Sequence, residues 1–231
     1  MRKTIFLVDA DDTILDFHGA SSCALKHAFV ATGLGWKQAY AEEFKKFNDG
    51  LWERLERKEI TRKQLIDSRF PWFLEYLNLP SVGNIFNEHY LKYLSENPIF
   101  IEGAENFLEK LRDMGRVFIV TNGTEWIQNE RFTRSGLFSM CEAAFISDKI
   151  GFDKPAKGYS DYVFSHVEGF EKEKAVWIGD SLSADIKAAN EASVTSIWFN
   201  PHKKKGNGKA IPDYEVANFD EILTILQKNC V

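Results

Sequence analysis

Short apolar runs alternate with amphipathic stretches along the chain beyond residue 98. The runs have the length of buried strands and lie at residues 117–121, 143–147, 175–178 and 194–199. Amphipathic helices are expected at 104–114, 157–166 and 219–229, with two more that end near Ser135 and Ala192. Strands that alternate with helices in this way predict βαβ units and a parallel sheet.

Residues 17–96 have a different pattern, with aromatic and aliphatic residues at helical spacing and no strand-like run. Candidate helices lie at about 19–32, 36–57, 61–78 and 82–95, with Thr61 as the expected N-cap of the third. A further apolar run at residues 5–8 precedes this block. The pattern predicts an α/β protein with a doubly wound, Rossmann-like parallel sheet, formed by residues 1–16 and 97–231. Residues 17–96 are expected to be a helical bundle inserted as one domain.

Three carboxylates, Asp9, Asp11 and Asp12, directly follow the first predicted strand. Unpaired charge beside a buried strand is costly, so a cation is expected to compensate it. Asp9 and Asp11 are two residues apart and point the same way in an extended chain. Such a pair suits Mg²⁺, which prefers oxygen ligands, or a nucleophile beside an acid/base group. The alternative is a strand that runs into an Asp-rich turn.

Polar groups also follow three later predicted strands, namely Thr121-Asn122-Gly123, Lys154, and Gly179-Asp180 with Asp185. Each alone is also typical of an ordinary turn, loop or helix start, with Ser183 as the candidate N-cap of the last. In a doubly wound sheet, ligands bind outside the carboxyl ends of the strands, so these groups are expected to share one crevice with Asp9. Lys154 offers positive charge there, without which the carboxylates would repel one another and take up protons.

The residue types in this crevice suit a metal and a phosphate. Asp9 and Asp180 supply two carboxylates for one Mg²⁺, and Asp185 can approach the metal from the next helical turn. The Thr121 hydroxyl, with Asn122 and the backbone N–H groups of the turn, can hold phosphate oxygens.

Composition narrows the function classes. The 231 residues carry a net charge of −5, which is unlike a general nucleic-acid binder, and the short basic run at 203–205 is expected to be a solvated loop. No apolar run approaches the ~20 residues of a membrane span. Cys23, Cys141 and Cys230 lack zinc or disulfide spacing, and Cys23, which lies among helix-like residues, is expected to have a packing role. We expect a cytoplasmic protein that is a monomer or a small homo-oligomer.

The strand-end motifs resemble those of the haloacid dehalogenase superfamily. The matching residues are Asp9-Ala-Asp11-Asp-Thr13, Thr121, Lys154 and Gly179-Asp180…Asp185, in that order. The helical insert resembles the C1-type cap of subfamily I. The dehalogenases of the superfamily do not place an acid/base Asp two residues after the nucleophile, whereas this chain has Asp11. The resemblance therefore implies an Mg²⁺-dependent phosphomonoester hydrolase.

The same resemblance implies a role for each residue. Asp9 attacks phosphorus and forms an aspartyl-phosphate, and Asp11 protonates the leaving oxygen and then activates water. Mg²⁺ is held by Asp9, Asp180 and the backbone carbonyl of Asp11. Thr121 binds the transferred phosphoryl group, and Lys154 neutralises the charge of Asp9 and the phosphate oxygens.

Asp12 stands where the common form of the superfamily has Gly. In this respect, and at residues 48–61, 179–186 and 198–201, the chain is similar to the branch of pyrimidine 5′-nucleotidases. The expected substrate is a pyrimidine nucleoside monophosphate. A sugar phosphate, phosphoglycolate or another small phosphate ester is the alternative. A haloacid dehalogenase and an Asp-phosphorylated switch protein are the other functions considered.

The cap is expected to recognise the rest of the ester. Phe17 and Trp52 can stack on a planar base, and Asn48, on the same helix face as Trp52, can hydrogen-bond its edge. The alternative is that Trp52 belongs to the core of the cap and Asn48 is exposed. Arg69 is expected to pair with a surface acid such as Glu75 or Asp67, with a distal anion as its alternative partner.

Overall fold

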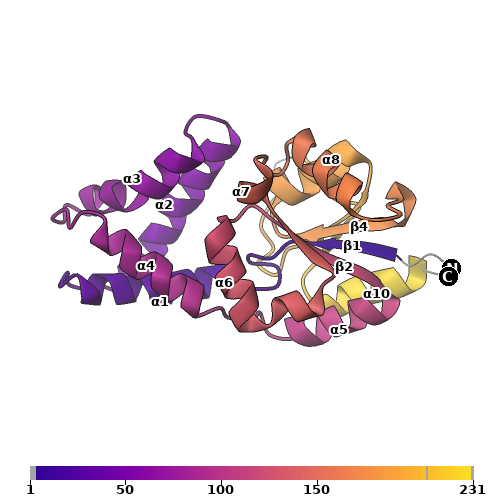
Figure 1. Ribbon diagram of the computed structural model, residues 1–231, viewed down its shortest axis with the longest axis horizontal. Helices are drawn as coiled ribbons and strands as arrows, with labels where there is room; N and C mark the ends of the chain where they lie inside the picture. The colour runs from indigo at the N-terminus through magenta and orange to yellow at the C-terminus, as the bar shows by residue number, and fades with distance from the viewer. Residues whose placement is uncertain (1–3, 207, 230–231) are drawn as a thin grey trace. The chain divides into compact units, whose positions relative to one another are not determined.

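The computed structural model describes residues 4–206 and 208–229, so Cys230 lies outside the described residues. These residues form two compact units. The core unit contains the described residues up to Asp16 and from Pro98 onward, and the helical unit is Phe17–Asn97. Figure 1 labels the main elements of both.

The core unit is built on a parallel sheet. Among the described residues its strands are β1 Thr4–Val8, β2 Gly115–Thr121, β3 Ala143–Ile146, β4 Ala175–Gly179, β5 Thr195–Phe199 and β6 Tyr214–Val216. Their order is β3-β2-β1-β4-β5-β6, and every neighbouring pair is parallel. β1 lies between β2 and β4, with Val8 opposite Ile119 and Ile178. The strand order reverses between β1 and β4, which is where ligands bind in such sheets.

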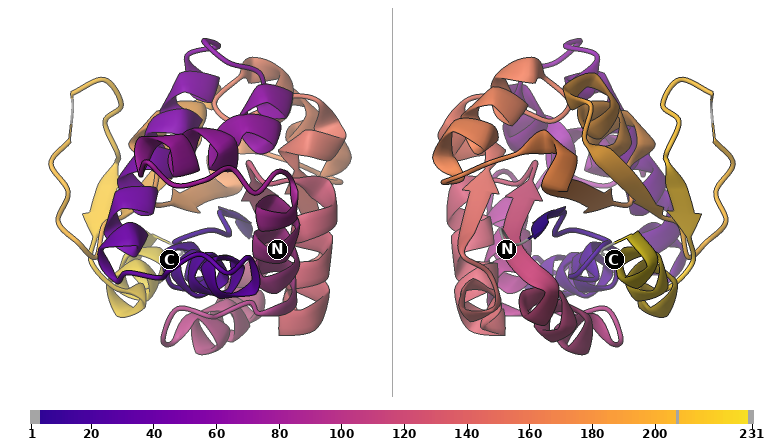
Figure 2. Two further views of the ribbon diagram at one scale, coloured as in Figure 1. Left: turned by 90° about the vertical axis from the view of Figure 1, so that its left-hand side faces the viewer. Right: turned by 90° about the vertical axis from the view of Figure 1, so that its right-hand side faces the viewer.

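Helices cover both faces of the sheet. They are α5 Ala104–Met114, α6 Glu125–Ser135, α7 Ser147–Ile150, α8 Lys157–His166, α9 Lys187–Ala192 and α10 Phe219–Asn229. In Figure 1, α5 and α10 lie below the strands and α8 lies above them. The chain between β5 and β6, which includes residues 200–206 and 208–213, forms a long loop at the side of the sheet (Figure 2).

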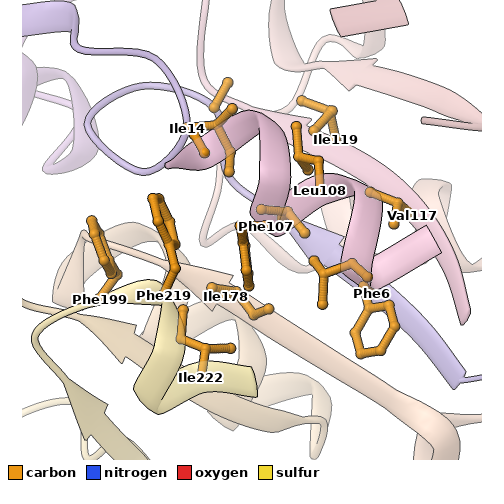
Figure 3. Packing of buried hydrophobic residues seen from close by; sticks show 14 of the residues in the cluster. Phe6, Ile14, Phe107, Leu108, Val117, Ile119, Ile178, Phe199, Phe219 and Ile222 are labelled. Carbon is orange, nitrogen blue, oxygen red and sulfur yellow. The ribbon is translucent and has the colours of Figure 1, made fainter. Parts of the chain in front are cut away.

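Alternation of side chains along β1 divides the apolar core into two layers. Phe6 and Val8 pack in the layer between the sheet and helices α5 and α10, whereas Ile5 and Leu7 pack against residues of α8 and α9. Figure 3 shows Phe6 in the first layer with Phe107, Phe219 and other residues of the cluster. Because both faces of β1 are buried from Ile5 to Val8, these four residues are all apolar, as is typical of a central parallel strand.

The helical unit contains α1 Phe17–Ala31, α2 Ala39–Glu56, α3 Arg62–Tyr76 and α4 Ile85–Glu96. Thr61 caps α3 in a capping box with Gln64, as predicted for its N-terminus. Aromatic rings fill the interior, for example Phe44 stacked on Phe70 with ring centroids 5.3 Å apart. Cys23 is exposed on α1, so the prediction that it has a packing role is wrong.

The predicted α/β fold with a parallel, doubly wound sheet is confirmed. β6 was not predicted, because three residues after a long loop carry no periodic pattern. The N-cap after β4 was predicted at Ser183 but lies at Ser181, whose side chain accepts from the Ala184 N–H at 3.2 Å. No helix within the described ranges has the length and hydropathy needed to cross a membrane.

Candidate active site

Asp9 is the first residue after β1, and its carboxylate is buried. The Asp9 N–H donates to the Ile178 carbonyl at 2.8 Å, which continues the β1–β4 pairing past Val8. Lys154 Nζ donates to Asp9 Oδ1 at 2.6 Å, and the Thr13 hydroxyl donates to Oδ2 at 3.1 Å. Burial raises the pKa of Asp9 well above its ordinary value, although Lys154 opposes the shift. A further cation near Asp9 would therefore stabilise its charged form.

The loop after Asp9 folds tightly back on itself. The N–H groups of Ile14 and Leu15 both donate to the Ala10 carbonyl, at 2.9 and 2.8 Å. This geometry places Asp12 in the left-handed region, with φ of +58°. Gly adopts that conformation without strain, and Asp is one of the few other residues that tolerate it. The loop therefore accommodates Asp12 in place of the Gly that is common in the superfamily.

Lys154 connects two buried carboxylates. Its ammonium donates to Asp9 Oδ1 and Asp185 Oδ1, each at 2.6 Å, and to the Val120 carbonyl at 2.8 Å. These three acceptors use all three hydrogens of the ammonium. Burial lowers the Lys154 pKa, but Asp185 and Asp9 outweigh that effect and hold it above its ordinary value. Lys154 is therefore a fixed, permanently charged partner of Asp9.

Asn122 holds the backbone of Lys154 in place. Its Oδ1 accepts from the Lys154 N–H at 2.7 Å, and its Nδ2 donates to the Lys154 carbonyl at 2.9 Å. Both ends of the amide are thus used to position Lys154. The contact of Asn122 with substrate stays a prediction.

Asp180 and Asp185 complete an acidic cluster with Asp9. One carboxylate oxygen from each of the three lies within 4.8 Å of the others. Asp185 is 1% exposed, and its Oδ2 accepts from the Ser181 N–H at 3.2 Å. Gly179 makes room for it, because a Cβ there would lie 2.3 Å from Asp185 Cγ.

Asp180 is the more accessible member of the cluster, with 19% of its side chain exposed. Trp198 Nε1 donates to the Asp180 carbonyl at 2.8 Å, and Lys204 Nζ lies 3.3 Å from Asp180 Oδ2. Burial and the nearby Asp185 raise the pKa of Asp180 to about 6, against the opposing charge of Lys204. Lys204 is solvent-exposed, as predicted for the basic run, but it also contacts the acidic cluster.

The donor set fits a divalent cation. The three ionised carboxylates of Asp9, Asp180 and Asp185 face two ammonium groups, the buried Lys154 and the exposed Lys204, which leaves an excess of one negative charge. All the potential ligand atoms are oxygens, which Mg²⁺ prefers. The raised pKa values of Asp9 and Asp180 have the same origin, because negative charge is concentrated where water is largely excluded.

Asp11 points to different partners from those of Asp9. Its Oδ1 accepts from Arg131 Nη1 at 2.5 Å, and its Oδ2 accepts from Gln128 Nε2 at 2.9 Å. Gln128 Nε2 also donates to the Thr121 hydroxyl oxygen at 2.9 Å. The carboxylate of Asp11 is not part of the acidic cluster found among the described residues. A metal contact from this residue therefore stays a prediction for its backbone carbonyl.

Gln128 and Arg131 were not predicted from the sequence. Both are on α6, and each is 1% exposed. Gln128 directly follows the buried Ile127, and Arg131 directly precedes the buried Phe132, so all four residues lie on one face of the helix. Two long polar residues on an otherwise apolar face were the signal that could have identified them.

Comparison with known proteins places the chain in a family. Residues 5–199 match the family described as haloacid dehalogenase-like hydrolase. The chain belongs to this family. The resemblance predicted from the strand-end motifs is thereby confirmed, and the chain is a hydrolase of the haloacid dehalogenase-like type.

Several relatives resemble this hydrolase over nearly its whole length. HAD-hydrolase YfnB of Bacillus subtilis is 35% identical over 97% of this chain and 96% of its own. Its crystal structure, described as bound to magnesium, has a TM-score of 0.92 and covers 98% of this chain and 99% of that chain. Pyrimidine 5′-nucleotidase PynA of Streptococcus pneumoniae is 34% identical, covering 99% and 97%. Pyrimidine 5′-nucleotidase YjjG of Escherichia coli is 26% identical, covering 99% and 100%.

The predicted base readers Phe17, Asn48 and Trp52 all belong to the helical unit of this hydrolase. Phe17 is the first residue of α1 and is half-buried. Trp52 is partly buried against an apolar cluster that contains Leu51 and Ile60. The guanidinium carbon of Arg62 lies 5.5 Å from the centroid of the Trp52 ring. Asn48 is 3% exposed, so the alternative that it is a surface residue is wrong. Recognition of a base by these three residues stays a prediction.

Arg69 was expected to pair with a surface acid such as Asp67, but it is buried inside the helical unit. Its Nη1 donates to Asn48 Oδ1 at 3.2 Å, whereas Asp67 pairs with Lys63. The guanidinium lies over the ring of Phe70 at 4.8 Å and of Tyr90 at 5.0 Å. Arg69 Nε and Nη2 are buried without a hydrogen-bond partner, and burial lowers the Arg69 pKa. Neither spacing nor composition indicated that aromatic rings would enclose this charge.

Proposed function

We propose that this hydrolase is an Mg²⁺-dependent phosphomonoesterase that forms an aspartyl-phosphate on Asp9. The observation that carries the proposal is the Lys154 ammonium, which bonds Asp9 and Asp185 at 2.6 Å each beside Asp180. This arrangement gives a nucleophilic carboxylate a fixed positive neighbour and leaves the excess negative charge that a divalent cation neutralises. Positioning and charge neutralisation of this kind are the main sources of catalysis in phosphoryl transfer.

In the first step Asp9 acts as the nucleophile. One of its carboxylate oxygens forms a bond to phosphorus while the ester P–O bond breaks, and the leaving alkoxide takes a proton from Asp11. The Thr121 hydroxyl donates to an oxygen of the transferred group. Lys154 stays charged throughout and holds Asp9 in line.

In the second step water replaces the carboxylate. Asp11, now ionised, accepts a proton from a water molecule, and the water oxygen attacks phosphorus. The acyl-phosphate bond breaks, inorganic phosphate leaves, and the Asp9 carboxylate is restored. Asp11 carries a proton again and is ready for the next substrate.

Asp9, Asp180 and the backbone carbonyl of Asp11 would hold the Mg²⁺. Asp185 supports them, because its carboxylate fixes Lys154 and the Ser181 N–H beside the site. When bound, Mg²⁺ supplies positive charge against the carboxylates and the phosphoryl oxygens. The crystal structure of the Bacillus subtilis relative, described as bound to magnesium, supports this choice of metal.

We infer that the substrate is a pyrimidine nucleoside monophosphate. Two relatives that cover 99% of this chain are named pyrimidine 5′-nucleotidases, which supports the inference. The helical unit would act as a cap, with Phe17 and Trp52 stacking on the base and Asn48 reading its edge. The relative's crystal structure is described as revealing interdomain movement, which supports a mobile cap.

Phosphate release over a panel of esters, with and without Mg²⁺, tests the proposal. The panel contains dUMP, UMP, dTMP, AMP, sugar phosphates and phosphoglycolate. We expect metal-dependent release with a preference for the pyrimidine nucleotides. Broad release, or a preference for sugar phosphates, would retain the chemistry and overturn the substrate. No release from any ester would overturn the proposed phosphatase activity and would favour a dehalogenase or a phosphorylation switch instead.

Two substitutions test the roles of the acids. Asp9→Asn should abolish turnover, because an amide cannot form the acyl-phosphate. Asp11→Asn should slow both steps, by ~10²-fold or more, because acid–base catalysis is lost. Wild-type rates in Asp9→Asn would show that the nucleophile is misassigned.

A further inference from the structure

Gln128 connects two groups that the proposed reaction uses. Its Nε2 donates to Asp11 Oδ2 and to the Thr121 hydroxyl oxygen, each at 2.9 Å. Its Oε1 accepts from Arg131 Nη1 at 2.8 Å, and the same Nη1 donates to Asp11 Oδ1 at 2.5 Å. Thr121, Asp11, Gln128 and Arg131 thus form one hydrogen-bonded group at the end of β2.

The donors and acceptors in this group allow only one orientation of the Gln128 amide. Arg131 has no acceptor atom, so the Gln128 oxygen must face it and the NH₂ must face Asp11 and Thr121. The two hydrogens of that NH₂ are then divided between Asp11 and Thr121. Because the Thr121 oxygen accepts one of them, its own hydrogen remains available to donate to a phosphoryl oxygen.

Arg131 fixes the other side of Asp11. With Arg131 on Oδ1 and Gln128 on Oδ2, each carboxylate oxygen of Asp11 has a buried partner on α6. A general acid must be held within hydrogen-bond reach of the leaving oxygen, and small displacements cost large factors in rate. The pair on α6 therefore controls the placement of Asp11.

The turn after β2 is shaped around Gln128. A Cβ at Gly123 would lie 2.4 Å from Gln128 Cγ and 2.6 Å from its Nε2. The glycine of the Thr121-Asn122-Gly123 motif is therefore needed for the close approach of α6. The phosphate-binding turn and the glutamine fit together as one packed unit.

We propose that Gln128 and Arg131 are positioning residues of the phosphatase reaction. Gln128 aligns both the acid/base Asp11 and the phosphate-binding hydroxyl of Thr121, whereas Arg131 aligns Asp11 and the Gln128 amide. The inference rests on the proposed function, because it concerns the roles of Asp11 and Thr121 in that reaction.

The two residues should differ in what they control. Loss of Arg131 affects the proton transfer to the leaving group, because it removes a direct partner of Asp11. Loss of Gln128 affects that transfer and also the binding of phosphate, because the Thr121 hydroxyl loses its donor and its fixed orientation. A merely structural role would weaken the reaction of every substrate alike.

The test compares kcat/KM for an alkyl and an aryl phosphate ester in Gln128→Met and Arg131→Lys. This quantity covers only the steps through departure of the leaving group. An aryl ester with an acidic phenol needs little help from a general acid, whereas an alkyl ester needs much. In both variants we expect the fold-loss in kcat/KM to be ~10 times or more larger for the alkyl ester than for the aryl ester. Inorganic phosphate, used as an inhibitor, should bind more weakly to Gln128→Met and normally to Arg131→Lys.

Arg134→Met is the matched control, because Arg134 is on the same helix but is exposed and pairs with Glu130. This variant should have unchanged kcat/KM for both esters and unchanged inhibition by inorganic phosphate. Equal losses for the two esters, or unaltered phosphate inhibition in Gln128→Met, would overturn the positioning role while the wild-type activity stands. If the wild-type protein cleaved neither ester, the proposed function itself would fail and this inference with it. Gln128→Met keeps the Arg131–Asp11 ion pair intact, so the comparison remains available if Arg131→Lys folds poorly.

Discussion

Lys154 Nζ lies 2.6 Å from Asp9 Oδ1, although 145 positions separate the two residues in the sequence. The same ammonium lies 2.6 Å from Asp185 Oδ1, so one buried cation holds two buried carboxylates. The strand order brings them together, because β1 and β4 are neighbours in the sheet and Lys154 donates to the end of β2. The Lys154 ammonium therefore also links the chain after β1, the end of β2 and the segment after β4.

Substitution of Lys154 should affect both stability and turnover. Lys154→Met leaves Asp9 and Asp185 buried without their cation, and such a change typically costs about 3–5 kcal/mol of the free energy of unfolding. Urea unfolding measures that loss, and phosphate release should fall to background. Lys157→Met is the control, since Lys157 is exposed and its pairing with Asp161 contributes ~1 kcal/mol or less. Equal stability of the two variants would contradict the account.

The effect of Mg²⁺ on stability should depend on pH. The pKa of Asp180 is about 6, raised by burial from its ordinary value of 3.8. Between these values the folded protein binds more protons than the unfolded chain. The contribution of Asp180 to metal-free stability is therefore greatest below 3.8 and is lost as the pH rises through about 6. Mg²⁺ competes with this proton, so it should stabilise most above that pH.

The measurement is the rise in Tm on adding Mg²⁺, at about pH 5 and about pH 7.5. We expect a larger rise at the higher pH. Asp180→Asn should remove most of the rise and most of its pH dependence. A rise that is larger at the lower pH would contradict the charge assignment.

Gly179 should be intolerant of even a methyl group. A Cβ there would lie 2.3 Å from Asp185 Cγ, so Gly179→Ala must displace Asp185 from Lys154. Thermal unfolding should show a loss of ~1–3 kcal/mol, typical of overpacking, with a fall in activity. Gly50→Ala is the contrasting variant, because Gly50 is inside α2 with open space around it. It should be neutral or stabilising by about 0.5–1 kcal/mol; a harmless Gly179→Ala would show that Asp185 does not need its observed position.

Asn48 and Arg69 should be energetically coupled. Asn48 Oδ1 accepts from Arg69 Nη1, and the other two nitrogens of that guanidinium are buried without a partner. Asn48→Leu should therefore destabilise the protein by about 1–3 kcal/mol when Arg69 is present. It should cost much less in an Arg69→Met background, where no buried charge remains to be satisfied. A double-mutant cycle measures this difference, and additive effects would show that the contact is not important for stability.

The helices with clear amphipathic periodicity were predicted with accurate bounds. α5, α8 and α10 agree with the predicted ranges of 104–114, 157–166 and 219–229. In α2 the predicted start at residue 36 was three residues early, because Trp36 continues the aromatic pattern but precedes the helix. β6 and the one-turn α7 were missed, since three or four residues are too few for a period to repeat.

The sequence predicted which residues of the candidate site lie at strand ends, but not which of their side chains are in contact. Because parallel strands end at one edge of the sheet, the sequence could indicate that Asp9, Lys154 and Asp180 would be neighbours. It could not indicate which side chains contact one another. Two examples are the hydrogen bond from the Lys154 N–H to Asn122 and the hydrogen bond from Gln128 to Asp11. Both depend on how the loops and α6 pack. Periodicity carries no information on such contacts.

Identification of the phosphorylated residue tests the central claim most directly. The protein is mixed with Mg²⁺ and an aryl phosphate, then quenched with borohydride, which reduces an aspartyl-phosphate to homoserine. Asp11→Asn is used alongside the wild type, because slow hydrolysis should let the intermediate accumulate. Peptide mass spectrometry should find homoserine at position 9. Homoserine at another position, or none at any position while phosphate is released, would contradict the assignment of Asp9 as the nucleophile.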